Sequence, residues 1–239
     1  MIYLYTGTPG SGKSLDTARL LKARLWQKKP VICNFPISRN VKNYEYFHYK
    51  RNDELTVEYL TNFAKEYFGK NRVKEGQIIL IIDEAQMIFN SRDWAKSDRQ
   101  GWNTFFQIHR HFGYDVFLST QFDKMLDRQI RSLVEYEVIH RKVNNYGWRG
   151  KILQLFFLAP TLFVRVKYWY PMKEKVDSNF FRGSKRLYRL YDTYALSFLD
   201  EEKADDEEEK EETQPEEEKE ETQPEEEKEE TESDAVVNE

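Results

Sequence analysis

Residues 7–14 are the first group whose types and spacing could do chemistry. They read Gly-Thr-Pro-Gly-Ser-Gly-Lys-Ser, which matches the phosphate-binding pattern G-x-x-x-x-G-K-[ST]. Glycines in such a loop let backbone N–H groups close around phosphate oxygens without a Cβ in the way. The pattern assigns Lys13 to the β- and γ-phosphates and the Ser14 hydroxyl to Mg²⁺. The expected nucleotide-binding residues are Gly7, Thr8, Pro9, Gly10, Ser11, Gly12, Lys13, Ser14 and Leu15.

Asp83 and Glu84 form the second group. They follow five consecutive aliphatic residues, 78–82, which predict a strand buried on both faces of a parallel sheet. Ligands of open α/β sheets bind at the carboxyl ends of the strands, where these acids would stand. We expect Asp83 to hold Mg²⁺, usually through water, and Glu84 to polarise an attacking water.

The acidic pair has a second interpretation. Alone, it also fits a buried strand followed by a solvated turn. Combined with the loop at 7–14, it favours a nucleoside triphosphatase. It also argues against a small-molecule kinase, because an activated water would compete with that enzyme's acceptor.

Two amide side chains follow other predicted strands. Gln121 ends a strand predicted over 114–121, where an amide could position the attacking water or sense the γ-phosphate. The alternative is a glutamine in a surface loop. Asn34 ends a short strand predicted over 30–36, either as a site residue or as the start of a local turn before a proline.

Two helices carry candidate arginines. Arg110 and His111 stand in the last turn of a helix predicted over 97–113, where they complement the helix dipole, or where one of them contacts a nucleotide in this subunit or a neighbour. Arg131, like Arg128, lies on a helix predicted over 124–132. Either one could act as an arginine finger across a subunit interface, since a guanidinium matches spread-out transition-state charge, or could simply be solvated.

The elements that must position these groups alternate between strands and helices. A strand over 2–6 runs into the loop, and a helix over 15–25 presents its positive dipole end to the phosphates. We predict an α/β fold of the RecA/ASCE-like P-loop NTPase class, with a mainly parallel central sheet flanked by helices. The other predicted elements are a possible edge strand over 44–49, a helix over 58–68, and antiparallel edge hairpin strands over 136–143, 150–158 and 162–169.

Charge divides the chain into a basic body and an acidic tail. The last 40 residues, from Asp200, hold 23 acidic residues and four lysines, whereas residues 1–199 hold 33 basic and 19 acidic residues, a net charge of +14. The tail repeats a nine-residue unit with regular prolines and no aromatic residues, so we expect 200–239 to be disordered and 1–199 to be one domain. A single cysteine, Cys33, excludes an intramolecular disulfide and is typical of a reducing compartment.

Residues 165–191 interleave basic and aromatic side chains. That mixture suits a nucleic-acid backbone with stacked bases, and it equally suits ordinary amphipathic packing.

The order of these motifs resembles one family. Residues 6–14, 34–36, 82–86 and the Arg110-x-x-Gly-x-Asp pattern followed by Ser119-Thr120-Gln121 are similar to the zonula occludens toxin (Zot) family. These are filamentous-phage morphogenesis ATPases placed near the FtsK/HerA-like DNA translocases. The resemblance covers roughly residues 1–170.

The resemblance implies an ATP-hydrolysing, homo-oligomeric ring, such as a hexamer, that acts in extrusion and packaging of single-stranded phage DNA. Its partners would be that DNA or a DNA–protein complex, together with coat or membrane assembly proteins. It would work in the cytoplasm, at the cytoplasmic face of the host inner membrane. Family members typically carry a transmembrane helix after the ATPase domain, where this chain has its acidic tail. We therefore expect either membrane contact through partners, or a plasmid or phage variant with a different role. A nucleotide-gated scaffold that does not hydrolyse ATP, and a small-molecule kinase, remain the alternatives.

Overall fold

The computed structural model describes residues 1–90, 99–143, 148 and 161–190. Contacts divide the chain into two units, Met1–Ser197 and Phe198–Glu239. All the described residues belong to the first unit, and the predicted tail lies outside them.

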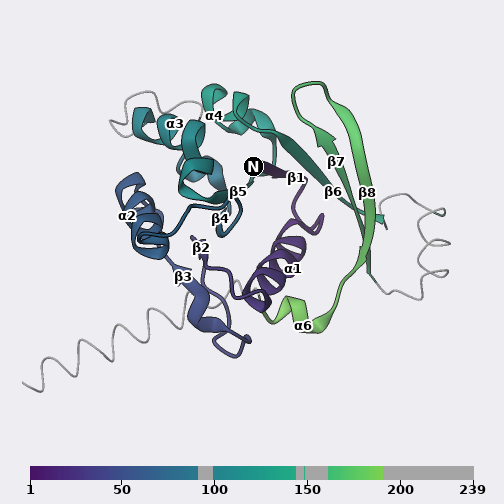
Figure 1. The fold of residues 1–239 in the computed structure, drawn as a ribbon. Coiled ribbons are helices and arrows are strands. Elements are labelled where there is room, and N and C mark those ends of the chain that lie inside the picture. Colours follow the sequence, from purple (N-terminus) through teal and green to yellow (C-terminus); the bar gives the residue numbers. More distant parts are fainter. Residues whose placement is uncertain (91–98, 144–147, 149–160, 191–239) are drawn as a thin grey trace, which may run out of the picture. The chain divides into compact units, whose positions relative to one another are not determined.

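The helices and strands of the first unit alternate along most of its length (Figure 1). The helices are α1 (Lys13–Trp26), α2 (Val57–Phe68), α3 (Arg99–Ile108), α4 (Arg128–Ser132) and α6 (Lys185–Tyr188). The strands are β1 (Ile2–Thr6), β2 (Val31–Cys33), β3 (Phe47–Tyr49), β4 (Ile78–Ile82), β5 (Tyr114–Ser119), β6 (Tyr136–Lys142), β7 (Leu162–Trp169) and β8 (Glu174–Arg182). Single 3₁₀ turns cover Tyr44–Tyr46, Ala85–Met87, His109–Phe112 and Asp123–Met125.

One sheet joins all the described strands in the order β3-β2-β4-β5-β1-β6-β7-β8. Pairing is parallel from β3 through β6, and β7 and β8 are added in antiparallel fashion. The carboxyl ends of β1, β4, β5 and β6 therefore share one edge of the sheet, and the antiparallel β7 begins at that same edge. This confirms the predicted α/β fold with a mainly parallel sheet and flanking helices.

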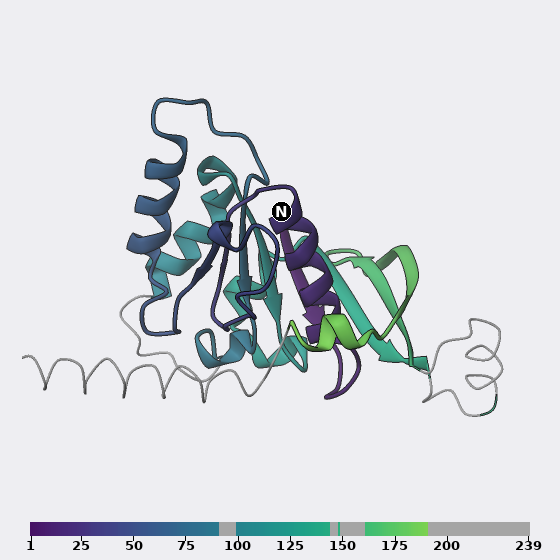
Figure 2. The same cartoon turned by 90° about the horizontal axis from the view of Figure 1, so that it is seen from below.

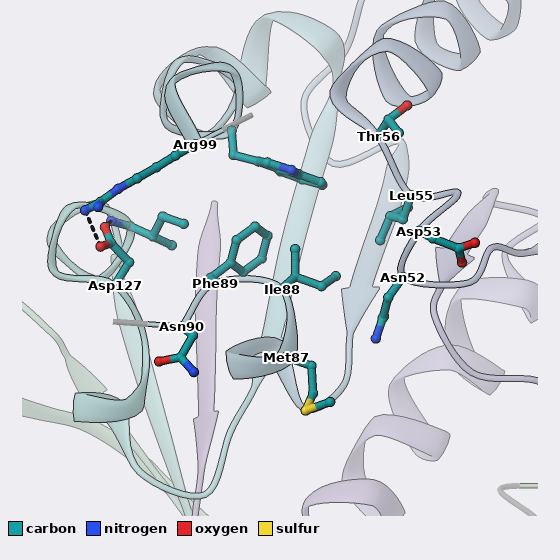
Figure 3. A pocket seen from close by; sticks show the side chains of 12 residues that line it. Asn52, Asp53, Leu55, Thr56, Met87, Ile88, Phe89, Asn90, Arg99 and Asp127 are labelled. Carbon is teal, nitrogen blue, oxygen red and sulfur yellow. Dashed lines mark hydrogen bonds and ion pairs between the residues drawn. The ribbon is translucent and has the colours of Figure 1, made fainter. Parts of the chain in front are cut away.

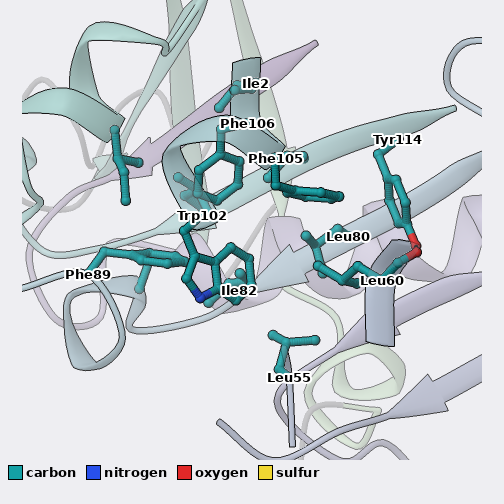
Figure 4. Packing of buried hydrophobic residues seen from close by; sticks show 14 of the residues in the cluster. Ile2, Leu55, Leu60, Leu80, Ile82, Phe89, Trp102, Phe105, Phe106 and Tyr114 are labelled. Atoms are coloured by element: carbon teal, nitrogen blue, oxygen red, sulfur yellow. The ribbon is translucent and has the colours of Figure 1, made fainter. Parts of the chain in front are cut away.

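Helices cover both faces of the sheet. Ile78, Leu80 and Ile82 of β4 pack in the cluster that contains α2, α3 and α4, whereas Ile79 and Ile81 pack in the cluster that contains α1. Figure 4 shows the aromatic side chains of α3 against the first of these faces. All five β4 side chains are buried, as the uninterrupted aliphatic run predicts for a central strand covered on both sides.

The carboxyl-terminal part of the sheet differs from the sequence prediction. β6 does not form an edge hairpin, because it pairs in parallel with β1 inside the sheet. β7 pairs with it from the other side, and the hairpin is β7–β8. β8 was not predicted, because its exposed, charged residues carry no hydrophobic alternation. The strand predicted over 150–158 lies outside the described residues.

Two other elements are shorter than expected. The helix predicted over 124–132 begins only at Arg128, because the Asp127 carboxylate accepts hydrogen bonds from the main-chain N–H groups of Gln129 and Ile130 and caps α4 there. The expected edge strand over 44–49 is a 3₁₀ turn followed by β3. In the described ranges, no helix is long and apolar enough to cross a bilayer.

Candidate nucleotide-binding site

The loop between β1 and α1 has the backbone geometry that phosphate binding requires. Gly7, Gly10 and Gly12 adopt positive φ values of 145°, 72° and 99°. A Cβ at Gly12 would lie 2.7 Å from the Phe163 ring, and one at Gly7 would lie 2.6 Å from the His140 carbonyl oxygen. α1 begins at Lys13, so its free N–H groups and positive dipole end face the loop.

Polar atoms of the loop fit an anionic ligand. Lys13 is 7% exposed, and its Nζ donates to the Gly7 carbonyl at 2.6 Å. Burial lowers the pKa of Lys13, while the charges of Glu84 and Asp83 act to raise it. The Ser11 hydroxyl is buried without a hydrogen-bond partner among the described residues. A phosphate group would supply an acceptor for the Ser11 hydroxyl and a further negative charge beside Lys13.

The two predicted carboxylates follow β4, which is separated from β1 only by β5. The negative charges of both act to raise the pKa of Lys13, against the effect of its burial. Glu84 has φ 45° and ψ 49°, a left-handed conformation that is costly for a residue with a Cβ. The Glu84 carboxylate accepts a hydrogen bond from the Gln86 side chain. Strained backbone of this kind is concentrated at functional sites.

Asn34 holds the main chain of Asp83 from the neighbouring strand. Its Oδ1 accepts from the Asp83 N–H at 2.7 Å, and its Nδ2 donates to the Asp83 carbonyl at 2.9 Å. Nδ2 also donates to the Asn52 side chain at 2.8 Å. Of the two sequence interpretations of Asn34, these contacts favour a residue that positions the site.

Gln121 lies beside the loop through its main chain. Its carbonyl accepts from the Gly7 N–H at 3.3 Å, and the preceding Thr120 N–H donates to the Tyr5 carbonyl at 3.0 Å. The turn after β5 is thereby joined to the start of the phosphate loop. Gln121 is half-buried and follows β5 at the carboxyl edge of the sheet, and its role toward a nucleotide stays a prediction.

Of the two predicted arginines, Arg110 lies apart from the phosphate loop within the chain. Arg110 precedes β5, at the opposite edge of the sheet from the loop, and its Nη2 pairs with Glu135 Oε2 at 2.6 Å. Arg131 Nη1 donates to the Asp123 carbonyl at 3.5 Å. Arg110 is therefore not placed to contact a nucleotide bound to its own subunit. Contact with the nucleotide of a neighbouring subunit remains a prediction for both arginines.

A buried ionic network joins the first turns of α1 to the strands beside it. The Asp16 carboxylate, 1% exposed, contacts His140 Nε2 at 3.0 Å and Arg165 Nη1 at 3.0 and 3.1 Å. His140 Nδ1 lies 3.3 Å from the Thr6 carbonyl. Burial alone would raise the pKa of Asp16, but the hydrogen bond and charge of His140, with Arg165, lower it overall. Sequence analysis did not identify these residues as a group. His140 of β6 and Arg165 of β7 are far from Asp16 in sequence, and only the order of the strands in the sheet brings them next to α1.

A cavity of 420 Å³ continues from the loop. Besides loop residues 10–15, it is lined by residues that sequence analysis did not assign to the site: Lys142, Thr161, Phe163, Leu187 and Tyr188. Their sequence distance from the loop explains the omission. A local motif cannot show that α6 lies beside α1, as Figures 1 and 2 show.

A second cavity, of 330 Å³, is shown in Figure 3, and its lining includes residues 87–90, which follow the carboxylates in sequence. Asn52 lines it on one side, the residues after β4 line its floor, and the Arg99–Asp127 ion pair stands on another side. Asn52 thus connects this cavity with the Asn34–Asp83 contacts. The predicted site residues are not among those that line it.

The parallel sheet, the glycine loop at the start of α1 and the acids at the end of β4 together define a P-loop NTPase fold. The zonular occludens toxin (Zot) family model matches residues 1–195, and the chain belongs to this family. The Gene 1 protein of Enterobacteria phage I2-2 is 28% identical over 218 residues, covering 84% of this chain and 58% of that protein. A Pseudomonas phage Pf3 protein named as an assembly protein is 31% identical over 138 residues, covering 56% of this chain and 40% of its own length.

A solved structure shows the same fold. The N-terminal domain of zonular occludens toxin from Neisseria meningitidis superimposes with a TM-score of 0.51 at 21% identity, covering 80% of this chain and 98% of that domain. The chain spans less than two thirds of the length of the phage relatives described above.

Proposed function

We propose that this chain is an ATP-hydrolysing motor for phage assembly that extrudes or packages single-stranded DNA. The observation that carries the proposal is that β1, which leads into the phosphate loop, and β4, which leads into Asp83 and Glu84, both pair in parallel with β5, so that the loop and the acids share the carboxyl edge of the sheet. Its membership of a family with phage-encoded relatives supports the biological setting. The basic body, with net charge +14 over residues 1–199, supports a nucleic-acid partner.

The residues at this edge would divide the hydrolysis between them. Lys13 and the loop N–H groups would hold the β- and γ-phosphates, and Ser14 and Asp83 would hold Mg²⁺, which neutralises charge on the phosphate oxygens. Glu84 would accept the proton of the attacking water, and Gln121 would orient that water or sense the γ-phosphate.

We further propose that subunits assemble into a ring, which would let Arg110 or Arg131 act on a neighbour's nucleotide. Coat or membrane assembly proteins would then bring the ring to the cytoplasmic face of the host membrane.

Steady-state ATP hydrolysis by the wild type and by Glu84→Gln tests the proposal, with and without circular single-stranded DNA at low and high salt. We expect the wild type to turn over, DNA to stimulate it in a salt-sensitive way, and the variant to bind ATP without turnover. Binding without turnover by both proteins under every condition would instead identify a nucleotide-gated scaffold. Turnover that requires a small-molecule acceptor would identify a kinase.

A further inference from the structure

The residues that line the cavity next to the phosphate loop are of two chemical kinds. The loop backbone is polar, and Lys13 and Lys142 are cationic. Phe163 of β7 and Leu187 and Tyr188 of α6 are apolar or aromatic. The described lining residues include no carboxylate. Such a cavity suits a ligand that is anionic at one end and flat and apolar at the other.

An apolar cluster lies directly beside the phosphate loop. Leu15 and Phe163 are each 4% exposed, and they pack with Phe181 and Leu187 in one cluster. The Phe163 ring lies so close to Gly12 that a Cβ there would approach its Cδ1 to 2.7 Å. The loop that would hold a phosphate chain is therefore bordered by a packed apolar cluster.

Tyr188 lines the same cavity and is much more exposed than this cluster, at 49%. Its position is fixed by the turn that precedes α6. The Ser184 hydroxyl accepts from the Leu187 N–H at 3.3 Å and caps the helix, and the Gly183 N–H donates to the Thr161 carbonyl at 3.0 Å. A Cβ at Gly183 would lie 2.9 Å from the Tyr188 hydroxyl oxygen, so the glycine leaves room for the ring.

We propose that Leu187 and Tyr188 form the nucleobase subsite of this chain, with the base lying against the Tyr188 ring. The proposal rests on the proposed nucleotide binding at residues 7–14. A flat base fits it chemically, because aromatic side chains stack on the π-face of any base. The half-exposed Tyr188 ring has a free surface to offer, whereas Leu15 and Phe163 are almost completely covered.

The test compares a ligand that has a base with one that does not. Calorimetric titrations with Mg²⁺ would measure the affinity of the full chain for a non-hydrolysable β,γ-imido ATP analogue and for inorganic tripolyphosphate. For Tyr188→Ala we expect about tenfold weaker binding of the analogue and unchanged binding of tripolyphosphate, because only the analogue has a base that stacks on the ring. Tyr188→Phe keeps the ring and should bind both ligands like the wild type.

Two further variants separate the possible failures. Tyr67→Ala removes a similarly exposed tyrosine from α2 and should change neither affinity, whereas Lys13→Ala should weaken both. If the wild type binds both ligands and Tyr188→Ala binds both equally well, the subsite is overturned and the proposed function stands. If the wild type binds neither ligand, the proposed function itself fails. Unchanged thermal midpoints would show that the variants remain folded.

Discussion

The side-chain amide of Asn34 bonds both the N–H and the carbonyl of Asp83, at 2.7 and 2.9 Å. β2 and β4 are paired in parallel, so the ends of these two strands meet although the residues are 49 positions apart. Beyond the last pair of the β2–β4 ladder, the Asn34 amide bonds the Asp83 main chain in the way that a backbone amide of a longer strand would. It thereby fixes the main chain from which the proposed Mg²⁺ ligand, Asp83, extends. Groups that orient a metal ligand typically matter nearly as much as the ligand itself.

Asn34→Ala should lower ATP turnover about tenfold and raise the Mg²⁺ concentration needed for half-maximal rate, because Asp83 loses both contacts. Tripolyphosphate binding without Mg²⁺ should not change, since the loop is untouched. Asn40→Ala, at an exposed asparagine in the same connection, is the matched control. An unchanged Mg²⁺ dependence in Asn34→Ala would show that Asn34 is only a local turn residue.

Asp16→Asn should destabilise the fold by about 3 kcal/mol at pH 7, because it leaves Arg165 and His140 without their buried carboxylate. The pKa of Asp16 is lower in the folded chain than its ordinary value of 3.8. The stabilisation from the charged carboxylate is therefore present above that value and is lost as pH falls through the folded pKa.

Urea denaturation of the wild type and Asp16→Asn from pH 7 to pH 3 checks this prediction. The difference in unfolding free energy should shrink below about pH 4. A difference that stays constant over this range would show that charge at Asp16 is not what stabilises the network.

Glu84→Gly should be more stable than Glu84→Ala by about 1 kcal/mol, because φ at this position is 45° and a Cβ is unfavourable there. Both variants should lose turnover, since both lack the carboxylate. At the exposed Met87, whose φ is not positive, the order should reverse and alanine should be the more stable. Chemical denaturation of the four variants measures both differences, and the same order at both positions would contradict the prediction.

Gly12→Ala should cost about 3 kcal/mol and prevent tripolyphosphate binding, because the new Cβ meets the Phe163 ring and φ is 99°. Gly10→Ala should cost only about 1 kcal/mol, since a Cβ there meets nothing within 4 Å and only the φ of 72° is unfavourable. Thermal unfolding and titration of the two variants compare them directly. Equal losses of unfolding free energy in the two variants would mean that the Phe163 ring moves away from the new Cβ without destabilising the fold.

Arg110→Ala should leave the affinity for ATP within twofold of the wild type, because Arg110 lies at the sheet edge opposite the loop. Breaking its partly exposed ion pair should cost less than about 1 kcal/mol. Glu135→Gln breaks the same pair but keeps the guanidinium. If Arg110 serves a neighbouring subunit, turnover that rises with protein concentration should be lost in Arg110→Ala and kept in Glu135→Gln. Equal turnover in both would assign Arg110 a structural role only.

The sequence by itself determined the phosphate loop, the buried strand with Asp83 and Glu84 at its end, and the α/β class. These features depend on local requirements. Glycine is needed where φ is positive, aliphatic residues are needed where a strand is buried on both faces, and polar residues mark the strand's end. Gln121 could be placed at the carboxyl edge for the same reason, since it follows the neighbouring parallel strand β5 by two residues.

The tertiary structure alone decided which distant residues complete the site. The strand order brings Asn34 to Asp83 and His140 to Asp16, and the β7–β8 hairpin carries Tyr188 to the loop. β8 was not predicted, because an exposed edge strand needs no hydrophobic alternation. The interior position of β6 was predicted wrongly, because the order of strands in a sheet leaves no periodic pattern in the sequence. Contacts between residues far apart in sequence follow from how the sheet is assembled, and that is a property of the whole fold.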